Sequence, residues 1–316
     1  MTVCQLYAKQ IRHRGNVRYN TKNGRKRLMK LLEEDKLGGC PIDSVKLSDA
    51  KEWAIRMKEK GISYKTISND KRSLKAAFYT AIQDDCIRKN PFDFQLNTVI
   101  EDDTEPKVPL TPAQEESFLS FAQNDKVYQK YYDELIILLG TGLRISELCG
   151  LTDTDIDFEN RIINVDHQLL RSAETGYYIE TPKTKSGIRQ IPMSEKVYEA
   201  FNRVLKRRRG AKAVTIDGYS NFLFLNRDGY PKTATNYDGM FRGLAKKYNK
   251  YHEEALPKVM TPHTLRHTFC TNMANAGMNP KALQYIMGHS NITMTLNYYA
   301  HATFDSAKAE MLRIAA

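Results

Sequence analysis

The sequence predicts an α+β fold that is mostly α-helical. A helical N-terminal domain is expected at residues 1–100, and a mixed domain with a small antiparallel sheet at residues 110–316. Residues 1–95 carry apolar side chains at helical spacing among charged ones. Residues 101–109 are acidic, contain prolines and lack periodicity, which predicts a linker. Short β-like runs and turns follow only after that linker, among further helical segments.

The N-terminal domain is predicted to contain three clear helices. The first covers residues 21–36 and has a narrow stripe of leucines. The second begins with Ser48 as its N-cap and ends near Gly61. The third covers residues 63–85, and its expected buried face consists of Ile67, Leu74, Phe78 and Ile82. Its opposite side carries four basic residues that either face solvent or contact phosphate groups: Lys65, Lys71, Arg72 and Lys75.

The mixed domain is predicted to begin with a helix whose N-cap is Thr111 and whose first residue is Pro112. A helix over residues 131–139 then meets a Gly-Thr-Gly turn and resumes at residues 143–149. Three β-like runs follow, at residues 161–165, 177–181 and 188–192. From Ser194 onward the chain is predicted to be helical apart from residues 222–224, with new helices opening at Pro262, Pro280 and Asn291.

Composition limits the class of protein. Hydrophobic residues make up 41% of the chain, and the mean hydropathy is −0.55. No apolar run approaches the roughly 18 residues that a membrane-spanning helix needs. The five cysteines are scattered, without any Cys-x-x-Cys spacing. This pattern argues against a disulfide framework or a zinc knot and is typical of a reducing cytoplasm.

The positive charge is concentrated at one end of the chain. The formal net charge is +11, and residues 1–100 hold 21 Lys and Arg against 11 Asp and Glu. The remaining residues are almost balanced, with 27 basic against 26 acidic side chains. A basic segment of this kind suits the phosphates of a nucleic acid backbone. A basic soluble domain, or one that touches acidic lipid, would have the same composition.

Arg144 is the first candidate for a site residue. It follows the two glycines of the Gly-Thr-Gly turn, which permit a tight turn that presents an arginine at a helix start. Taken alone, the arginine is more simply explained by an ion pair to Glu147 three residues later.

Residues 261–267 form a second candidate element. With Thr261 as cap, His263 and Arg266 fall on one face in the first turns of a helix, near its positive pole. A hydrogen-bond donor and a fixed cation at a helix start suit a phosphate group. His263 and His267 also have the spacing of two metal ligands, but the glutamate of a hydrolytic zinc motif is missing. We therefore predict no metal site and a hydrogen-bonded core role for His267.

A third element begins with Gly288, which ends a helix and places His289 in the connecting turn. Ten residues later, Tyr299 is expected toward the end of the next helix, directly after Tyr298. Either tyrosine on its own is more simply explained by packing in the core.

Together these elements closely resemble the tyrosine recombinase (phage integrase) family in their order and spacing. The resemblance extends to the run at residues 181–192, where that family carries its catalytic lysine in a β-hairpin. The whole chain looks most like the integrases of Gram-positive conjugative transposons. Because those proteins carry a further N-terminal arm-binding domain, the resemblance implies that this chain is a fragment without it.

The resemblance implies a reaction and a role for each residue. Tyr299 would attack the scissile phosphodiester and form a 3′-phosphotyrosyl bond, although Tyr298 stays open because family members differ by one residue in this spacing. Arg144 and Arg266 would hold the non-bridging oxygens. Lys183 would act as general acid, with Lys185 as the alternative. His263 would assist proton transfer from the tyrosine, and His289 would donate a hydrogen bond to the phosphate. No metal or other cofactor is expected.

The resemblance also implies partners. Residues 1–100 would form a core-binding domain that closes with the catalytic domain into a C-shaped clamp around double-stranded DNA, with Lys65, Lys71, Arg72, Lys75 and Lys185 as DNA contacts. The protein would excise and integrate a mobile element in the bacterial cytoplasm, assemble on DNA as a dimer to tetramer, and work with a directionality factor. The tail at residues 304–316 would pack on a neighbouring subunit or on its own domain. A topoisomerase of type IB and a non-catalytic DNA-binding protein are the alternatives.

Overall fold

The computed structural model describes residues 1–15, 17–105, 108–182, 184–208, 214–299 and 311. The chain divides into two compact units, Met1–Pro106 and Lys107–Ala316, each built around a hydrophobic core. The division falls within the stretch predicted as a linker. The fold is mostly helical with small antiparallel sheets, as predicted.

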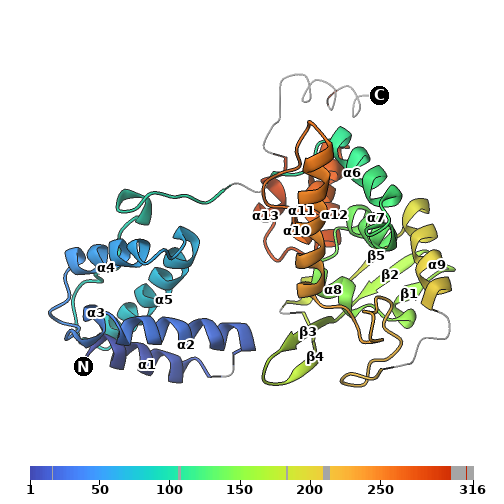
Figure 1. Ribbon diagram of the computed structural model, residues 1–316. Helices are drawn as coiled ribbons and strands as arrows, with labels where there is room; N and C mark the ends of the chain where they lie inside the picture. The colour runs from blue at the N-terminus through green and yellow to red at the C-terminus, as the bar shows by residue number, and fades with distance from the viewer. Residues whose placement is uncertain (16, 106–107, 183, 209–213, 300–310, 312–316) are drawn as a thin grey trace. The chain divides into compact units, whose positions relative to one another are not determined.

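The first unit is helical. Its elements are α1 (Val3–His13), α2 (Tyr19–Glu33), α3 (Lys36–Gly39), α4 (Leu47–Glu59), α5 (Tyr64–Gln83) and the short 3-10 helix η1 (Leu96–Thr98). Helix α1 packs against α2 and α5, and α4 packs against α5 (Figure 1). The three predicted helices are therefore confirmed as α2, α4 and α5. The predicted cap of α4 is wrong. Lys46 precedes the helix, and its backbone N–H donates to the Asp49 carboxylate at 2.8 Å, so Ser48 lies inside the first turn.

Aromatic rings hold the core of this unit together. Trp53 from α4, Phe78 from α5 and Phe92 from the following loop are fully buried. The ring of Phe92 meets that of Trp53 edge-on at 5.8 Å between centroids and lies 5.3 Å from that of Phe78. The loop after α5 thus packs over both helices.

The second unit contains eight α-helices among the residues that the structure describes. They are α6 (Pro112–Asn124), α7 (Tyr132–Thr141), α8 (Ile145–Gly150), α9 (Glu195–Arg208), α10 (Ala234–Tyr251), α11 (Pro262–Asn275), α12 (Pro280–Met287) and α13 (Thr293–Leu296). The predicted cap at Thr111 is confirmed: its hydroxyl accepts the Gln114 N–H, and the Gln114 side chain reaches back. Helix α7 is central and packs against α6, α9 and α11 (Figure 1).

Two small antiparallel sheets complete this unit. One has the order β1 (Ile156–Asp157), β2 (Ile162–Val165), β5 (Arg189–Pro192), and the other pairs β3 (Gln168–Ser172) with β4 (Gly176–Glu180). The three predicted runs are β2, β4 and β5, while β1 and β3 were not predicted.

The expectation of a β-hairpin over residues 181–192 is wrong. Strand β4 pairs with β3, and β5 pairs with β2, so this run connects two different sheets. The physical reason is the short turn after Ser172, closed by Gly176 at φ 71°, which joins β4 to the strand before it. Residues 222–224 are not helical, as predicted, and Phe222 makes a single bridge to Thr152.

The search for a membrane-spanning segment has a negative result. Among the residues that the structure describes, no helix has the length and apolar character needed to cross a bilayer.

We predict that Phe92→Ala destabilises the first unit by about 3–5 kcal/mol, because it removes a fully buried ring and leaves a cavity between two helices. Trp53 is the only tryptophan of the chain, so its fluorescence during urea unfolding measures this unit alone. The matched control is Phe201→Ala in the core of the second unit, which should leave the Trp53 transition within about 0.5 kcal/mol of its original value. An unchanged transition in Phe92→Ala contradicts the prediction.

Candidate active site

Arg144 is positioned by the tight turn between two helices. Helix α7 ends at Gly142, whose φ of 64° is left-handed. A Cβ at this glycine would also lie 2.5 Å from the ring of Phe269, so a larger residue would clash. Arg144 is then the N-cap residue of α8. Its side chain is 34% exposed and therefore accessible to a ligand.

Arg266 lies deeper in the same region. It is 4% exposed, and its guanidinium donates to the carbonyl oxygens of Gly142 and Met287. These bonds connect the start of α11 to the ends of α7 and α12. Burial, followed by the positive charge of Arg144, lowers the pKa of Arg266 to about 9, so the guanidinium remains charged at neutral pH.

Glu147 joins two arginines. One carboxylate oxygen accepts the Arg144 side chain at 2.6 Å, and the other accepts the Arg144 backbone N–H at 2.9 Å. Arg189 donates to the same two oxygens at 3.1 and 2.8 Å. Burial alone would raise the pKa of Glu147, but the hydrogen bonds and charge of Arg189, with the charges of Arg144 and Arg266, lower it to about 2. The carboxylate is therefore ionised at neutral pH.

His289 occupies the turn after α12. Gly288 ends that helix with a φ of 60°, and the His289 ring is buried with Nδ1 3.0 Å from the Thr295 hydroxyl. Burial, followed by the charges of Arg266 and Arg144, lowers the pKa of His289 to about 4. The ring is neutral at pH 7 and retains one N–H to donate.

The two adjacent tyrosines follow α13 rather than lying within it, because that helix ends at Leu296. The Tyr298 hydroxyl contacts Nδ1 of His267 on α11. The Tyr299 hydroxyl instead donates to the carbonyl oxygen of Met278 at 2.5 Å. Burial, followed by Cys270, raises the pKa of Tyr298 to about 12, while the charge of Arg266 acts in the opposite direction. Burial and Cys270 also raise the pKa of Tyr299.

Of the remaining predicted catalytic residues, the structure describes His263 and Lys185 but not Lys183. His263 is exposed near the start of α11, with its ring 5.4 Å from that of His267. Lys183 lies outside the described residues. Lys185 is exposed in the 3-10 helix η4 (Lys185–Gly187). This turn lies against the His289 turn: a Cβ at Gly288 would be 3.0 Å from the backbone oxygen of Ser186.

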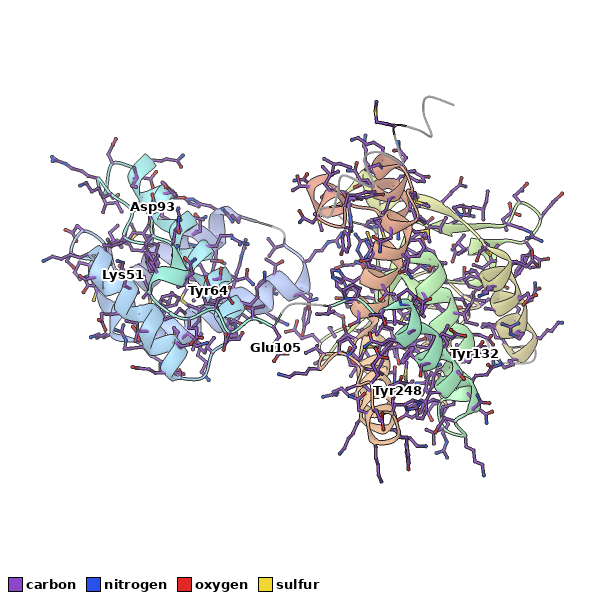
Figure 2. All side chains as sticks on the ribbon, turned by 90° about the horizontal axis from the view of Figure 1, so that it is seen from above. Lys51, Tyr64, Asp93, Glu105, Tyr132 and Tyr248 are labelled. Carbon is purple, nitrogen blue, oxygen red and sulfur yellow. The ribbon has the colours of Figure 1, made fainter. Side chains whose placement is uncertain are left out.

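The four basic residues predicted as DNA contacts on α5 fall into two pairs. Lys65 and Arg72 are exposed. Lys71 donates to the carbonyl oxygen of Phe94 at 2.5 Å and lies 4.4 Å over its ring. Lys75 pairs with Asp93 at 2.5 Å (Asp93 is labelled in Figure 2). Lys71 and Lys75 thus fasten the loop after α5 to the helix.

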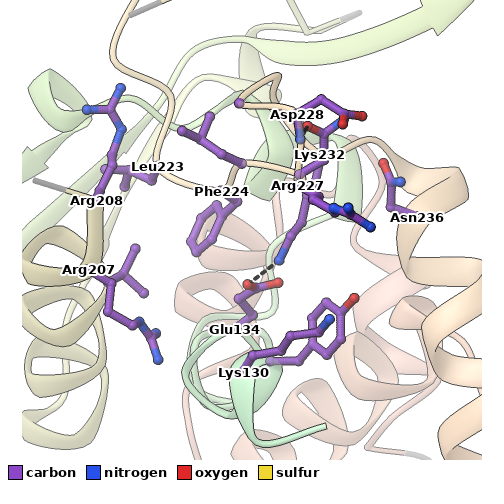
Figure 3. A pocket seen from close by; sticks show the side chains of 15 residues that line it. Lys130, Glu134, Arg207, Arg208, Leu223, Phe224, Arg227, Asp228, Lys232 and Asn236 are labelled. Carbon is purple, nitrogen blue, oxygen red and sulfur yellow. Dashed lines mark hydrogen bonds and ion pairs between the residues drawn. The ribbon is translucent and has the colours of Figure 1, made fainter. Parts of the chain in front are cut away.

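A separate concavity of about 700 Å³ lies between α7, α9 and the loop before α10 (Figure 3). Its cations are mostly engaged by the protein itself. Lys232 pairs with Glu134 at 2.5 Å, and Arg207 pairs with Asp133 at 2.5 Å. Arg208 donates to the carbonyl oxygen of Phe222 at 2.5 Å. This concavity is a weaker anion site than the cluster around Glu147, where three arginines surround one carboxylate.

One group of side chains has the composition of a metal site. Ligand atoms of Asp155, Asp166 and His167 lie within 4.8 Å of one another. Both ring nitrogens of His167 already face protein oxygens, Nδ1 the Asp166 carboxylate at 2.6 Å and Nε2 the Gly150 carbonyl at 2.8 Å. The group is therefore explained as a hydrogen-bond network around the buried His167, with Asp166 at the surface.

The structure thus gathers Arg144, Arg266 and His289 around one spot, with the two tyrosines packed beside α11. Sequence reasoning missed Arg189 as part of this cluster. A signal was present: Arg189 shares the inward phase of β5 with Ile191, an unusual position for an arginine unless a buried acid accepts it. The sequence also predicted a core role for His267, whereas in the structure its Nδ1 contacts the Tyr298 hydroxyl.

Comparison with known proteins identifies the class. Residues 109–306 match the phage integrase family. The chain is 69% identical over 314 residues to the transposase from transposon Tn916 of Enterococcus faecalis, covering 99% of this chain and 77% of that protein. It is 27% identical to the tyrosine recombinase XerC of Bacillus subtilis, with 84% and 78% covered. The chain belongs to the phage integrase family, whose members are tyrosine recombinases.

Solved structures agree with this relationship. A fragment of the Tn1549 transposon integrase in complex with a circular intermediate DNA is 78% identical, with 99% of both chains covered and a TM-score of 0.95. The same fragment with a tyrosine-to-phenylalanine substitution, in complex with transposon right end DNA, is 78% identical over 100% of both chains, with a TM-score of 0.94.

We predict that His289 stays neutral down to about pH 5 and titrates near pH 4 in the DNA-free protein, because burial and three arginine charges oppose protonation. Its folded pKa lies below the unfolded value of about 6.5. The unfolded state therefore binds the proton first, and this group lowers the free energy of unfolding as pH falls from about 6.5 to about 4. Imidazole nitrogen shifts in NMR measure the midpoint, and a midpoint above pH 6 contradicts the prediction. His289→Asn should lose this part of the pH dependence.

Proposed function

We infer that this protein is a site-specific tyrosine recombinase that cuts and rejoins DNA to excise and integrate a conjugative transposon. The observation that carries the inference is the cluster of Arg144, Arg266 and His289 near a half-buried tyrosine, Tyr298, in a chain 69% identical to a transposon transposase. Relatives solved with circular intermediate DNA and transposon end DNA support double-stranded DNA as the substrate. The same relatives favour strand exchange over topoisomerase-like relaxation or non-catalytic binding.

The chemistry requires charge stabilisation at the scissile phosphate. Attack by a tyrosine oxygen produces a pentacoordinate transition state with extra negative charge on the non-bridging oxygens. Arg144 and Arg266 would bind those oxygens, since a guanidinium stays charged and binds through a planar fork. His289 would donate a hydrogen bond to the phosphate through the N–H of its neutral ring. The bond energy passes into the 3′-phosphotyrosyl link, so rejoining needs no external energy source.

We propose Tyr298 as the nucleophile, in place of the Tyr299 predicted from sequence. The Tyr298 hydroxyl faces His267 and is influenced by the charge of Arg266, whereas that of Tyr299 is bound to a backbone carbonyl. A second argument comes from the Tn1549 integrase fragments, which span as many residues as this chain. Counted from their first residue, the substituted arginine falls on Arg144 and the substituted tyrosine on Tyr298. Because the count from the first residue places an arginine on an arginine, it supports the equivalence of the substituted tyrosine and Tyr298 as well.

Proton transfer would involve three further residues. With a pKa of about 12, Tyr298 needs an acceptor for its proton during attack. His267 would hold the hydroxyl before cleavage, and His263 remains the proposed acceptor once DNA is bound. Lys183 remains the proposed general acid for the leaving 5′-oxygen, and the exposed Lys185 is its alternative.

DNA binding would use both units. We propose that residues 1–100 form the core-binding domain and residues 110–316 the catalytic domain, with the duplex held by both. Lys65 and Arg72 would contact phosphates directly, whereas Lys71 and Lys75 would act mainly by fixing the loop that follows α5. Several copies would assemble on DNA, since strand exchange requires two duplexes. Acting on chromosomal DNA, the protein would work in the bacterial cytoplasm.

Covalent capture tests the nucleophile. On a suitably nicked duplex, cleavage frees a short fragment that carries the new 5′-hydroxyl and diffuses away, so the protein stays attached to the 3′-phosphate of the DNA. We expect Tyr298→Phe to abolish this adduct, because the attacking oxygen is removed. Tyr299→Phe is the matched control and should retain adduct formation within about tenfold, since it loses only one hydrogen bond. Loss of the adduct in Tyr299→Phe with retention in Tyr298→Phe would return the nucleophile to Tyr299.

Salt dependence tests the division of the α5 residues. We expect Arg72→Gln to weaken DNA binding and to reduce the slope of log affinity against log salt by about 1, as the loss of one phosphate contact does. Lys75→Gln is the matched control on the same helix; its slope should change less, because its Nζ is already paired with Asp93. Equal slope changes in the two variants contradict the division.

A further inference from the structure

We propose that Arg189 is a positioning residue of the active site, which acts through Glu147 to leave Arg144 available to the scissile phosphate. It does not need to touch DNA itself. The inference rests on the proposed recombinase function and assigns a role to a residue outside the set expected to contact the phosphate.

The Arg189 side chain is buried, and the protein accepts hydrogen bonds from each of its nitrogens. Its side chain is 0% exposed, and all three of its nitrogens donate. Nε donates to the Ile286 carbonyl oxygen at 2.6 Å, and Nη1 to that of Gly187 at 3.1 Å. Nη1 and Nη2 also bind the Glu147 carboxylate as a fork. A lysine could not reproduce this arrangement, since its single ammonium lacks the planar fork.

The charges explain why the cluster needs Arg189. Glu147 is the acid that Arg144 and Arg189 share. With Arg189 present, the carboxylate is already neutralised, so Arg144 can also bind a phosphate. Without Arg189, the buried carboxylate would have Arg144 as its remaining direct ion-pair partner and would compete with the phosphate for it.

Arg189 also connects three segments that carry site residues. Its partners lie in α8, at the end of α12 and in the η4 turn that follows Lys183. The backbone of Gly288 is enclosed between the two arginines: Arg144 donates to its carbonyl oxygen at 3.0 Å, and a Cβ on it would lie 3.1 Å from Nη1 of Arg189. The guanidinium therefore packs directly against the turn that presents His289.

The test uses the full chain on the nicked duplex and measures the single-turnover rate of adduct formation, DNA affinity and thermal melting. We expect Arg189→Met to slow cleavage by about 100-fold, the effect of a small misplacement of reacting groups. DNA affinity should change by less than about threefold, because the Arg189 side chain is fully buried and offers no surface to DNA. The control for loss of a charge is Arg203→Met, which removes an arginine of α9 that pairs with Asp133 of α7. This variant should cleave at the original rate.

Rescue distinguishes positioning from simple structural support. In the double variant Arg189→Met with Glu147→Gln, no buried carboxylate competes for Arg144, so cleavage should recover by about tenfold relative to Arg189→Met, one power of ten being about 1.4 kcal/mol. A structural role alone predicts no recovery, because the double variant has lost more hydrogen bonds. A double variant as slow as Arg189→Met, or an Arg189→Met protein that cleaves like the original, overturns the proposal.

Failure of Arg189→Met to fold and failure of the unsubstituted protein to cleave have separate meanings. Should Arg189→Met fail to fold, Arg189→Lys retains the charge, and we expect it to fold and to cleave slowly; cleavage at the original rate would overturn the proposal. If the unsubstituted protein forms no adduct, the recombinase function fails before the role of Arg189 is reached.

Discussion

The site depends on one buried carboxylate shared by arginines. Three guanidinium groups close together repel one another, and burial increases that cost because water no longer screens them. Glu147 offsets part of the repulsion, and the carbonyl oxygens of Gly142 and Met287 solvate Arg266. The cluster still has more positive than negative charge. This residual charge is fixed in place without DNA, so little reorganisation would be needed to bind a phosphate there.

The same charges determine what the neighbouring groups can do. His289 among the arginines is held neutral, and the half-buried Tyr298 beside an apolar surface resists ionisation. The two adjacent tyrosines both pack beside α11, but their hydroxyls meet different partners: that of Tyr298 contacts His267, and that of Tyr299 donates to the Met278 carbonyl oxygen. Where α13 ends therefore decides which hydroxyl is available. Because α13 has only four residues, a shift of its end by one position would exchange the places of the two hydroxyls.

Local signals predicted most helices and the residues that cap them. Thr111 and Pro112 mark a helix start by hydrogen bonding and fixed φ, and such effects depend on a few neighbouring residues. Strand β5 pairs with the distant β2 and not with β4 just before it, which explains why residues 181–192 were taken for a hairpin. Strand β3 was missed although its pairing with β4 is local. Among the site residues, Arg144, Arg266 and His289 could be assembled from motifs. Arg189 could not, because its role depends on a carboxylate 42 positions earlier in the chain.

Net charge is an incomplete guide to where DNA binds. The first unit carries most of the positive excess, yet Lys71 and Lys75 on α5 are engaged with the loop that follows. The concavity near α10 is lined by many cations, and its lysine and arginines largely hold neighbouring segments of the protein. The cluster at Glu147 differs because its arginines outnumber its acid while one of them stays partly exposed. A phosphate would supply the missing negative charge there, whereas at Lys71, at Lys75 and in the concavity it would first have to displace an existing partner.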